Sequence, residues 1–297
     1  MSSLKVLRHR IQSIKSTRKI TSAMKLIATA HFKKLQKHYE TSALYSYSIF
    51  KCLDSVLKYK DLDDELPLFL KETPKKRHLI IVLGSDRGLC GGFNVAVTKQ
   101  LSSYVSAITE EVKFLCVGTR VEPLLPQSMK EKVIKIVGMN DKTHYSDALN
   151  LAYFLESQIA LGEFDCCSIV YNRFQSIISY VPTVHPLIPF TKTMKTKVDC
   201  TRLFLDGSED TKVPLFGVEP DVRSLLKTLA FKSVTSQLHA ACIESQLSEQ
   251  SARMMAMDNS MRSAEDMLHK LETTYHRSRQ AMITNELIEI IAGAESL

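Results

Sequence analysis

The glycine-rich stretch Gly84–Asn94, GSDRGLCGGFN, comes closest to a chemical site in its residue types and spacing. It follows an apolar run, Leu79–Leu83, and precedes a helical pattern, which is where phosphates bind in doubly wound folds. Its glycines match neither GxGxxG nor GxxxxGKS/T, and Lys99 lies too far along the chain to be a phosphate-loop lysine. Two interpretations stay open: a nucleotide-binding loop, or a tight turn in which glycine permits close packing.

Cys90 is the candidate nucleophile of this stretch, because Asp86 and Arg87 lie close to it in the sequence. A nucleophilic thiol needs an adjacent base, and no nearby histidine or second acid completes a recognisable triad. The nine histidines of the chain show neither an HExxH motif nor another paired spacing, so zinc chemistry is not supported.

Cysteines are scattered along the chain without a CxxC pair. The seven are Cys52, Cys90, Cys116, Cys166, Cys167, Cys200 and Cys242. An odd number of scattered cysteines in a long chain indicates reduced thiols in a reducing compartment. We therefore expect them to behave as buried small apolar residues.

The composition is that of an ordinary soluble protein, with 297 residues, 44% of them hydrophobic and 24% charged. No apolar run approaches the length of about 18 residues that a membrane helix needs, so any membrane contact would go through a partner. The net charge of +7 is uneven, because residues 1–40 are rich in Lys and Arg and hold one acid, Glu40. Residues 221–297 hold more acids than bases, so the two ends are electrostatically complementary.

The basic start admits three interpretations. It is Arg-, Lys- and Ser-rich and amphipathic, which is typical of a mitochondrial transit peptide. It could instead bind nucleic acid phosphates, or form a solvated face that meets acidic protein loops. The apolar seam is interrupted at Arg18, Thr21 and Lys25 but resumes at Ala28–Val56 without a cleavage-like break, which favours assigning the start to the mature helix.

Two segments predict very long helices. Asp221–Ala292 contains no Gly or Pro, and a helix of that length would extend roughly 110 Å at about 1.5 Å per residue. Apolar or small residues recur in it at alternating steps of three and four, the pattern of a coiled coil, with Ser233, Ser236 and Gln250 as weak points. The first breaker in the chain is Pro67, and residues 3–58 predict the antiparallel partner helix.

The middle of the chain predicts a different architecture. Strand-like and helix-like runs alternate from His78 to Phe190, which indicates a parallel sheet covered by helices, with one antiparallel edge. The fold class is therefore α/β with long helices, in which an antiparallel coiled coil carries an inserted Rossmann-like α/β domain. The predicted divisions are a helix at 1–58, a linker at 59–76, the α/β domain at 77–219 and a helix at 220–297.

Three stretches resemble the gamma subunit of the rotary ATP synthase. Residues 7–30 contain RHRIQSIKSTRKITSAMKLIATA, and Ser85–Asn94 reads SDRGLCGGFN, very close to the family signature. Ser248–Leu297 is the most specific of the three, with SEQSARMMAMDNSMRSAEDM and RSRQAMITNELIEIIAGAESL. The resemblance covers the whole chain and is weakest at residues 59–76 and 191–219.

The resemblance implies a function. In this family the two terminal helices form an antiparallel coiled coil inside a ring of three alpha and three beta subunits. The coiled coil turns with a membrane-embedded ring of c subunits, and the α/β domain at its foot binds a small rotor subunit of the delta or epsilon type. Proton-driven rotation then cycles the nucleotide sites of the ring through ATP synthesis. The family's gamma subunit has no catalytic residues, so the resemblance implies a non-catalytic subunit with no cofactor and no metal.

The resemblance also assigns roles to single residues. Met24 matches the methionine that faces the acidic catch region of a beta subunit, and basic Lys19 and Lys25 flank it. Gln250 and Arg253 match a polar pair that engages a catch loop. Matching positions near the end of the shaft are Arg279, Gln280, Thr284 and Glu289, and Ile290–Leu297 would lie in an apolar bearing. The signature loop comprises Ser85, Asp86, Arg87, Gly88, Cys90, Gly91 and Gly92.

The ending AGAESL resembles mitochondrial and alpha-proteobacterial members. The expected location is the matrix side of the mitochondrial inner membrane, with the cytoplasmic face of a bacterial plasma membrane as the alternative. Thiol control is not expected, because the chain lacks paired cysteines. The rival functions are a basic coiled coil that binds nucleic acid or serves as a scaffold, and a small enzyme that binds nucleotide at Gly84–Asn94.

Overall fold

The computed structural model describes residues 2–57, 67–71, 76–138, 144–189 and 221–295. Most of the predicted linker at 59–76, all of the polar stretch 191–220, which contains Cys200, and the last two residues of the C-terminal apolar stretch lie outside the described residues.

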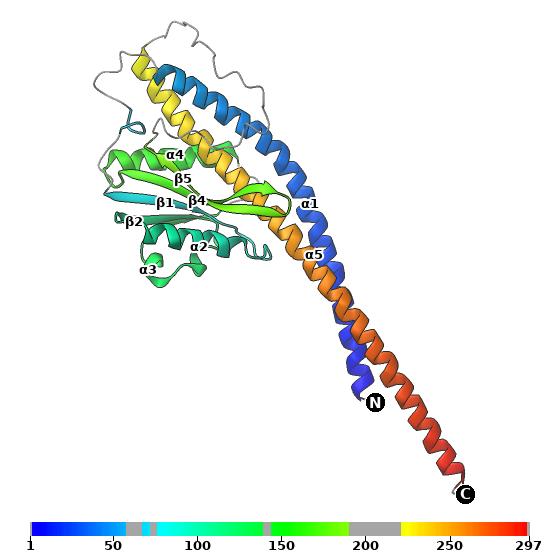
Figure 1. Cartoon of the computed structure of the whole chain (residues 1–297). Helices are drawn as coiled ribbons and strands as arrows, with labels where there is room; N and C mark the ends of the chain where they lie inside the picture. Colours follow the sequence, from blue (N-terminus) through cyan, green and yellow to red (C-terminus); the bar gives the residue numbers. More distant parts are fainter. Residues whose placement is uncertain (1, 58–66, 72–75, 139–143, 190–220, 296–297) are drawn as a thin grey trace. The chain divides into compact units, whose positions relative to one another are not determined.

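Two long helices dominate the secondary structure (Figure 1), α1 at Ser2–Leu57 and α5 at Val222–Glu295. The absence of Gly and Pro from α1 lets it run unbroken, and hydroxyls such as Thr17 and Thr29 bond carbonyls of their own helix four residues back. Asp221 caps the N-terminus of α5, because its carboxylate accepts the backbone N–H of Ser224 at 2.7 Å.

The two helices run antiparallel. Lys15 pairs with Glu272 at 2.8 Å, Arg18 with Glu265 at 3.6 Å and Lys25 with Asp258 at 2.5 Å. The residue number on α5 falls as the number on α1 rises, which defines the direction. The predicted antiparallel arrangement of the terminal helices is confirmed, and so is the predicted complementarity of basic α1 and acidic α5.

A five-stranded sheet has the order β3-β2-β1-β4-β5. The strands are β1 at Arg77–Leu83, β2 at Glu111–Val117, β3 at Val133–Val137, β4 at Cys166–Ser176 and β5 at Ser179–Ile188. Strands β1 to β4 pair in parallel, and β5 pairs antiparallel with β4. This confirms the predicted parallel sheet with one antiparallel edge.

Helices cover both faces of the sheet. They are α2 at Phe93–Ser106, the short elements η1 at Glu122–Leu124 and α3 at Gln127–Lys130, and α4 at Tyr145–Ala160. Alternation along buried β1 decides the faces: Ile80 and Val82 pack in a cluster with Val97 of α2. Leu79, Ile81 and Leu83 belong to the opposite cluster, which includes residues of α4, α1 and α5. Figure 1 shows α4 on one side of the sheet and α2 on the other.

The chain forms two compact units. One consists of Met1–Ala30 and Arg253–Leu297, and the other is His31–Ala252. Each long helix contributes to both units, whereas the sequence-based division assigned each helix to a domain of its own. Those predicted domain boundaries stay a prediction. Among the described helices, none contains a segment of the length and apolar character that crossing a membrane requires.

Candidate functional site

The glycine-rich loop is held by hydrogen bonds among its own residues. The Asn94 side chain accepts the backbone N–H of Ser85 at 3.0 Å and donates to the Ser85 hydroxyl at 2.8 Å. That hydroxyl donates in turn to the carbonyl of Arg87 at 2.9 Å. The Asp86 carboxylate accepts the backbone N–H of Thr119 at 2.9 Å, which ties this loop to the one after β2. These are the polar groups that a phosphate would have to recruit.

Two glycines of the loop are required by its backbone. A Cβ added to Gly84 would lie 1.8 Å from a methyl carbon of Val121, so no larger residue fits there. Gly91 has a φ of 58°, in the left-handed region that favours glycine. Both observations support the interpretation of the loop as a tight turn made for close packing.

The loop also closes the crevice at the carboxyl end of the sheet. Cys90 and Phe93 are 3% and 0% exposed and pack in a cluster with Ala252 of α5 and Tyr180 of β5. The Asn172 side chain donates to the Phe93 carbonyl at 2.9 Å. Protein side chains therefore occupy the place where doubly wound folds bind nucleotides. A thiol as buried as that of Cys90 is inaccessible to a substrate, which argues against a nucleophile.

Helix α5 carries a buried polar segment, Ser233–Arg253, that the sequence did not single out as a site. Glu244 is 4% exposed, and its carboxylate accepts hydrogen bonds from the Tyr171 hydroxyl at 2.9 Å and the Phe174 backbone N–H at 3.2 Å. Burial raises the pKa of this carboxyl from 4.5 to about 7, against the opposing effects of Tyr171 and Arg173. The sequence did contain a sign of this buried carboxylate, because Glu244 is the only Asp, Glu, Lys or Arg between Lys232 and Glu249.

The first pair of predicted coupling residues lies on α1. Met24 is half-buried, and the Lys25 ammonium contacts Asp258, which also pairs with Arg262 at 2.9 Å. The hydrogen bond from Lys25 lowers the pKa of the Asp258 carboxyl below its usual value. The Lys25 side chain nevertheless keeps 36% exposure. Large apolar side chains beside this pair are exposed on α1: Ile20, Leu26 and Ile27.

The second pair, Gln250 and Arg253, is largely covered by the chain itself, with 9% exposure for each residue. Between them, the Ser251 hydroxyl donates to the carbonyl of Ile177 in the turn between β4 and β5. The turn of α5 that carries Gln250 thus packs on the β4–β5 hairpin. The roles assigned to Gln250 and Arg253 stay predictions.

The third group lies near the end of α5 and is exposed, comprising Arg279, Gln280, Thr284 and Glu289. The Thr284 hydroxyl donates to the Gln280 carbonyl at 2.9 Å, so two of these residues share one turn of helix. Large apolar side chains are interleaved with them, with exposures from 48% to 67%: Ile283, Leu287, Ile288, Ile290 and Ile291. Within the unit formed by Met1–Ala30 and Arg253–Leu297, α5 extends past the start of α1, as Figure 1 shows.

A family model described as ATP synthase matches residues 3–297 of the chain. The ATP synthase gamma chain of Rhodospirillum rubrum is 38% identical over 307 residues, and that of Dinoroseobacter shibae is 37% identical over 303. Both alignments cover all of this chain and all of the relative. The chain belongs to the ATP synthase gamma chain family.

Solved structures of ATP synthase rotors share the fold. A chain of the Euglena gracilis mitochondrial enzyme (OSCP/F1/c-ring) has a TM-score of 0.66 at 16% identity, covering 99% of this chain and 94% of its own. A chain from the central stalk and c-ring of the Tetrahymena thermophila enzyme has a TM-score of 0.60 at 24% identity, covering 81% and 98%. Among the residues that the structure of the present chain describes, no group of three His, Cys, Asp or Glu side chains is arranged to hold a metal ion.

Proposed function

We propose that this chain is the central rotor shaft of an ATP synthase. It couples proton-driven rotation of a c ring to conformational cycling of a catalytic ring of alpha and beta subunits. The observation that carries this proposal is the end of α5, a single helix whose large apolar residues are exposed from Ile283 to Ile291. Such a helix end calls for a surrounding apolar sleeve, and a sleeve without specific polar partners lets the helix turn.

The partners follow from the same proposal: the alpha and beta subunits, the c-ring subunits and a small rotor subunit of the delta or epsilon type. Solved chains of this fold come from a central stalk with a c ring and from an assembly named OSCP/F1/c-ring. Met24, Lys25 and the exposed group Arg279, Gln280, Thr284 and Glu289 are the residues that we expect to touch beta subunits. Gln250 and Arg253 complete the set, through the small part of each side chain that stays exposed.

The chain is proposed to be a non-catalytic subunit that binds no cofactor and no metal. The internally hydrogen-bonded loop at Gly84–Asn94 and the buried Cys90 support this, because the two candidates for chemistry both have structural roles. The loop Ser85–Gly92 then serves to fix the α/β domain against α5, through the contact of Cys90 and Phe93 with Ala252.

The chain is proposed to lie on the membrane surface through its partners. The gamma chains of Rhodospirillum rubrum and Dinoroseobacter shibae are bacterial, which supports the cytoplasmic face of a bacterial plasma membrane. The matrix side of the mitochondrial inner membrane, which the sequence put first, is the corresponding place in a mitochondrion.

Binding of nucleic acid by the basic helix is the weaker alternative. Lys15, Arg18 and Lys25 are already paired with acids of α5, so part of the basic charge of α1 is neutralised within the chain. A phosphate backbone would have to compete with these pairs.

Native mass spectrometry of the chain, purified gently from its source, tests the proposal. We expect an assembly that contains this chain once, together with three copies each of two nucleotide-binding chains. A chain recovered alone or as a homodimer would contradict the shaft function. Retention on DNA at physiological salt would then favour the alternative.

A further inference from the structure

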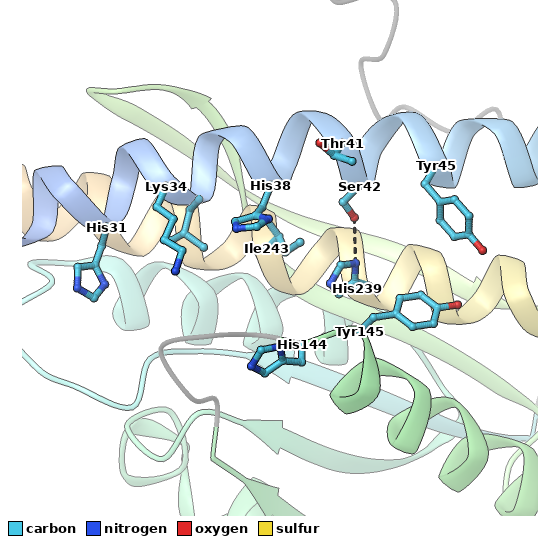
Figure 2. Close-up of a pocket in the computed structure, with 11 residues that line it drawn as sticks. His31, Lys34, His38, Thr41, Ser42, Tyr45, His144, Tyr145, His239 and Ile243 are labelled. Atoms are coloured by element: carbon cyan, nitrogen blue, oxygen red, sulfur yellow. Dashed lines mark hydrogen bonds between the residues drawn. The ribbon is translucent and has the colours of Figure 1, made fainter.

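A cavity of about 700 Å³ lies within the His31–Ala252 unit, between α1, α5 and the start of α4 (Figure 2). Its volume is in the range of small-molecule sites, which enclose about 300–1,000 Å³. No coupling residue named above lines it. The shaft function therefore leaves it without a role.

Histidine and lysine side chains line one end of the cavity. His31, Lys34 and His38 project from successive turns of α1, and His144 approaches from the residue before α4 (Figure 2). No Asp or Glu is among the lining residues, and no carboxylate of the described chain forms an ion pair with Lys34. The first turn of sixteen-residue α4 adds the positive end of a helix dipole.

The acid in the first turn of α4 is already engaged. The Asp147 carboxylate accepts the backbone N–H of His144 at 3.0 Å and so caps α4. His239 of α5 shares a hydrogen bond of 3.1 Å with Ser42. Burial and then the charge of His38 lower the pKa of His239, with Asp147 acting against them. An anion bound here would offset the repulsion between these imidazoles and would accept their N–H groups.

The other end of the cavity is aromatic. Tyr45 of α1 and Tyr145 of α4 meet edge to face with ring centroids 6.3 Å apart, and Tyr145 makes the same contact with His239 at 5.5 Å. Leu35 and Ile243 complete an apolar wall. Figure 2 shows the tyrosines on one side of His239 and the His31–Lys34–His38 row on the other.

We propose that this cavity binds a small organic anion, a phosphate monoester with an aromatic or apolar body. The phosphate would contact Lys34, His38 and His144, and the body would lie along Tyr45 and Tyr145. Hydrogen bonds between a charged donor and an anion are about twice as strong as neutral ones, so the head group supplies most of the specificity. All residues of the site belong to the His31–Ala252 unit, and the proposal does not depend on the shaft function.

Fluorescence titration of the full-length chain with 1-naphthyl phosphate tests the proposal. We expect saturable binding of one equivalent, competition by inorganic phosphate, and much weaker binding of neutral 1-naphthol. The variant Lys34→Ala should bind about tenfold more weakly, the loss expected for one charged hydrogen bond. Lys34 is exposed on a helix, so its replacement by alanine preserves the fold.

Lys33→Ala is the matched control, because Lys33 is the exposed neighbour of Lys34 on α1 and does not line the cavity. It should bind 1-naphthyl phosphate as the unaltered chain does. Equal weakening in both variants would show general attraction to a basic helix and would overturn the proposal. Absence of saturable binding, or binding by 1-naphthol as tight as by its phosphate, would overturn it as well.

Discussion

The hydroxyl of Tyr171 in β4 donates a hydrogen bond of 2.9 Å to the carboxylate of Glu244 in α5. Both residues are at most 5% exposed, so the sheet and the long helix share a polar contact inside the core. Burial makes the pKa of Glu244 rise to about 7 and that of Tyr171 rise well above its usual value. A carboxyl that titrates near neutral pH lies where α5 joins the α/β domain.

Glu244→Gln should remove a pH dependence from the stability of the chain. The folded pKa of about 7 exceeds the ordinary 4.5, so the folded state binds the proton more tightly than the unfolded state. The corresponding stability is fully present below pH 4.5 and is lost as pH rises through 7, by up to about 3 kcal/mol. Urea unfolding followed by circular dichroism, repeated at several values between about pH 5 and pH 8, measures how the free energy of unfolding changes with pH. This interval includes the folded pKa of Glu244.

Glutamine keeps an oxygen that can accept the Phe174 N–H and an amide that can bond Tyr171, so the variant should fold. Its stability should decline less between about pH 5 and pH 8 than that of the unaltered chain. Burial lowers the pKa values of His185 and His239, which acts in the opposite direction and equally in both chains, so the difference between the two slopes reports Glu244. A variant with the same slope as the unaltered chain would show that another group titrates there. Glu286→Gln, at an exposed position of α5, is the control and should leave the slope unchanged.

Asn94→Ala should destabilise the chain without changing its response to nucleotide. The side chain of Asn94 is 7% exposed and accepts the backbone N–H of Ser85, which alanine would leave buried and unpaired. An orphaned buried donor costs about 1–3 kcal/mol. Thermal unfolding should show the loss, whereas calorimetric titration with ATP should give no saturable heat for either chain. Saturable ATP binding that Asn94→Ala abolishes would restore the interpretation of the loop as a nucleotide site.

The sequence predicted the elements well because their signals are local. A three-four apolar seam in segments free of Gly and Pro indicated α1 and α5, and apolar runs bounded by turn residues indicated the strands. The loop Gly84–Asn94 was identified, but its role depends on Tyr180 and Ala252, which come from distant elements. Spacing within the loop cannot reveal such contacts.

The buried polar segment of α5 was missed for the same reason. A coiled-coil pattern implies one face against a partner and one face in solvent. In the structure nearly every residue from Ser233 to Arg253 is buried, because α1 and the α/β domain cover different sides of the helix. Ser233 and Ser236 looked like weak points of the seam, yet each is only 1% exposed and the Ser236 hydroxyl donates to the Ser233 carbonyl at 2.9 Å.

Thr284→Ala should lower coupled turnover of the assembled complex and leave the fold of the chain unchanged. Thr284 is exposed, and its hydroxyl bonds only the carbonyl of Gln280 among the contacts described. Thr274→Ala is a matched control, since Thr274 is also exposed on α5 and bonds the Lys270 carbonyl at the same 2.9 Å. Alanine is the better helix former at both sites. Reduced ATP synthesis in the first variant alone would support a coupling role, and equal activities would contradict it.

Deletion of Ile290–Leu297 should weaken the assembled complex more than it impairs rotation. The exposed large side chains removed with it, Ile290 and Ile291, are 67% and 57% exposed in the chain alone, so burying them in a sleeve stabilises the complex by their apolar area. The contact is apolar and undirected, so the remaining Ile283, Leu287 and Ile288 still allow the shaft to turn. The midpoint of thermal dissociation of the purified complex should fall, while rotation of a bead attached to the shaft continues.

A chain shortened after Ala294 is the control, because it keeps both isoleucines and should dissociate like the full chain. Complete failure of the longer deletion to assemble would mean that the end of α5 is a docking anchor for the ring rather than a bearing.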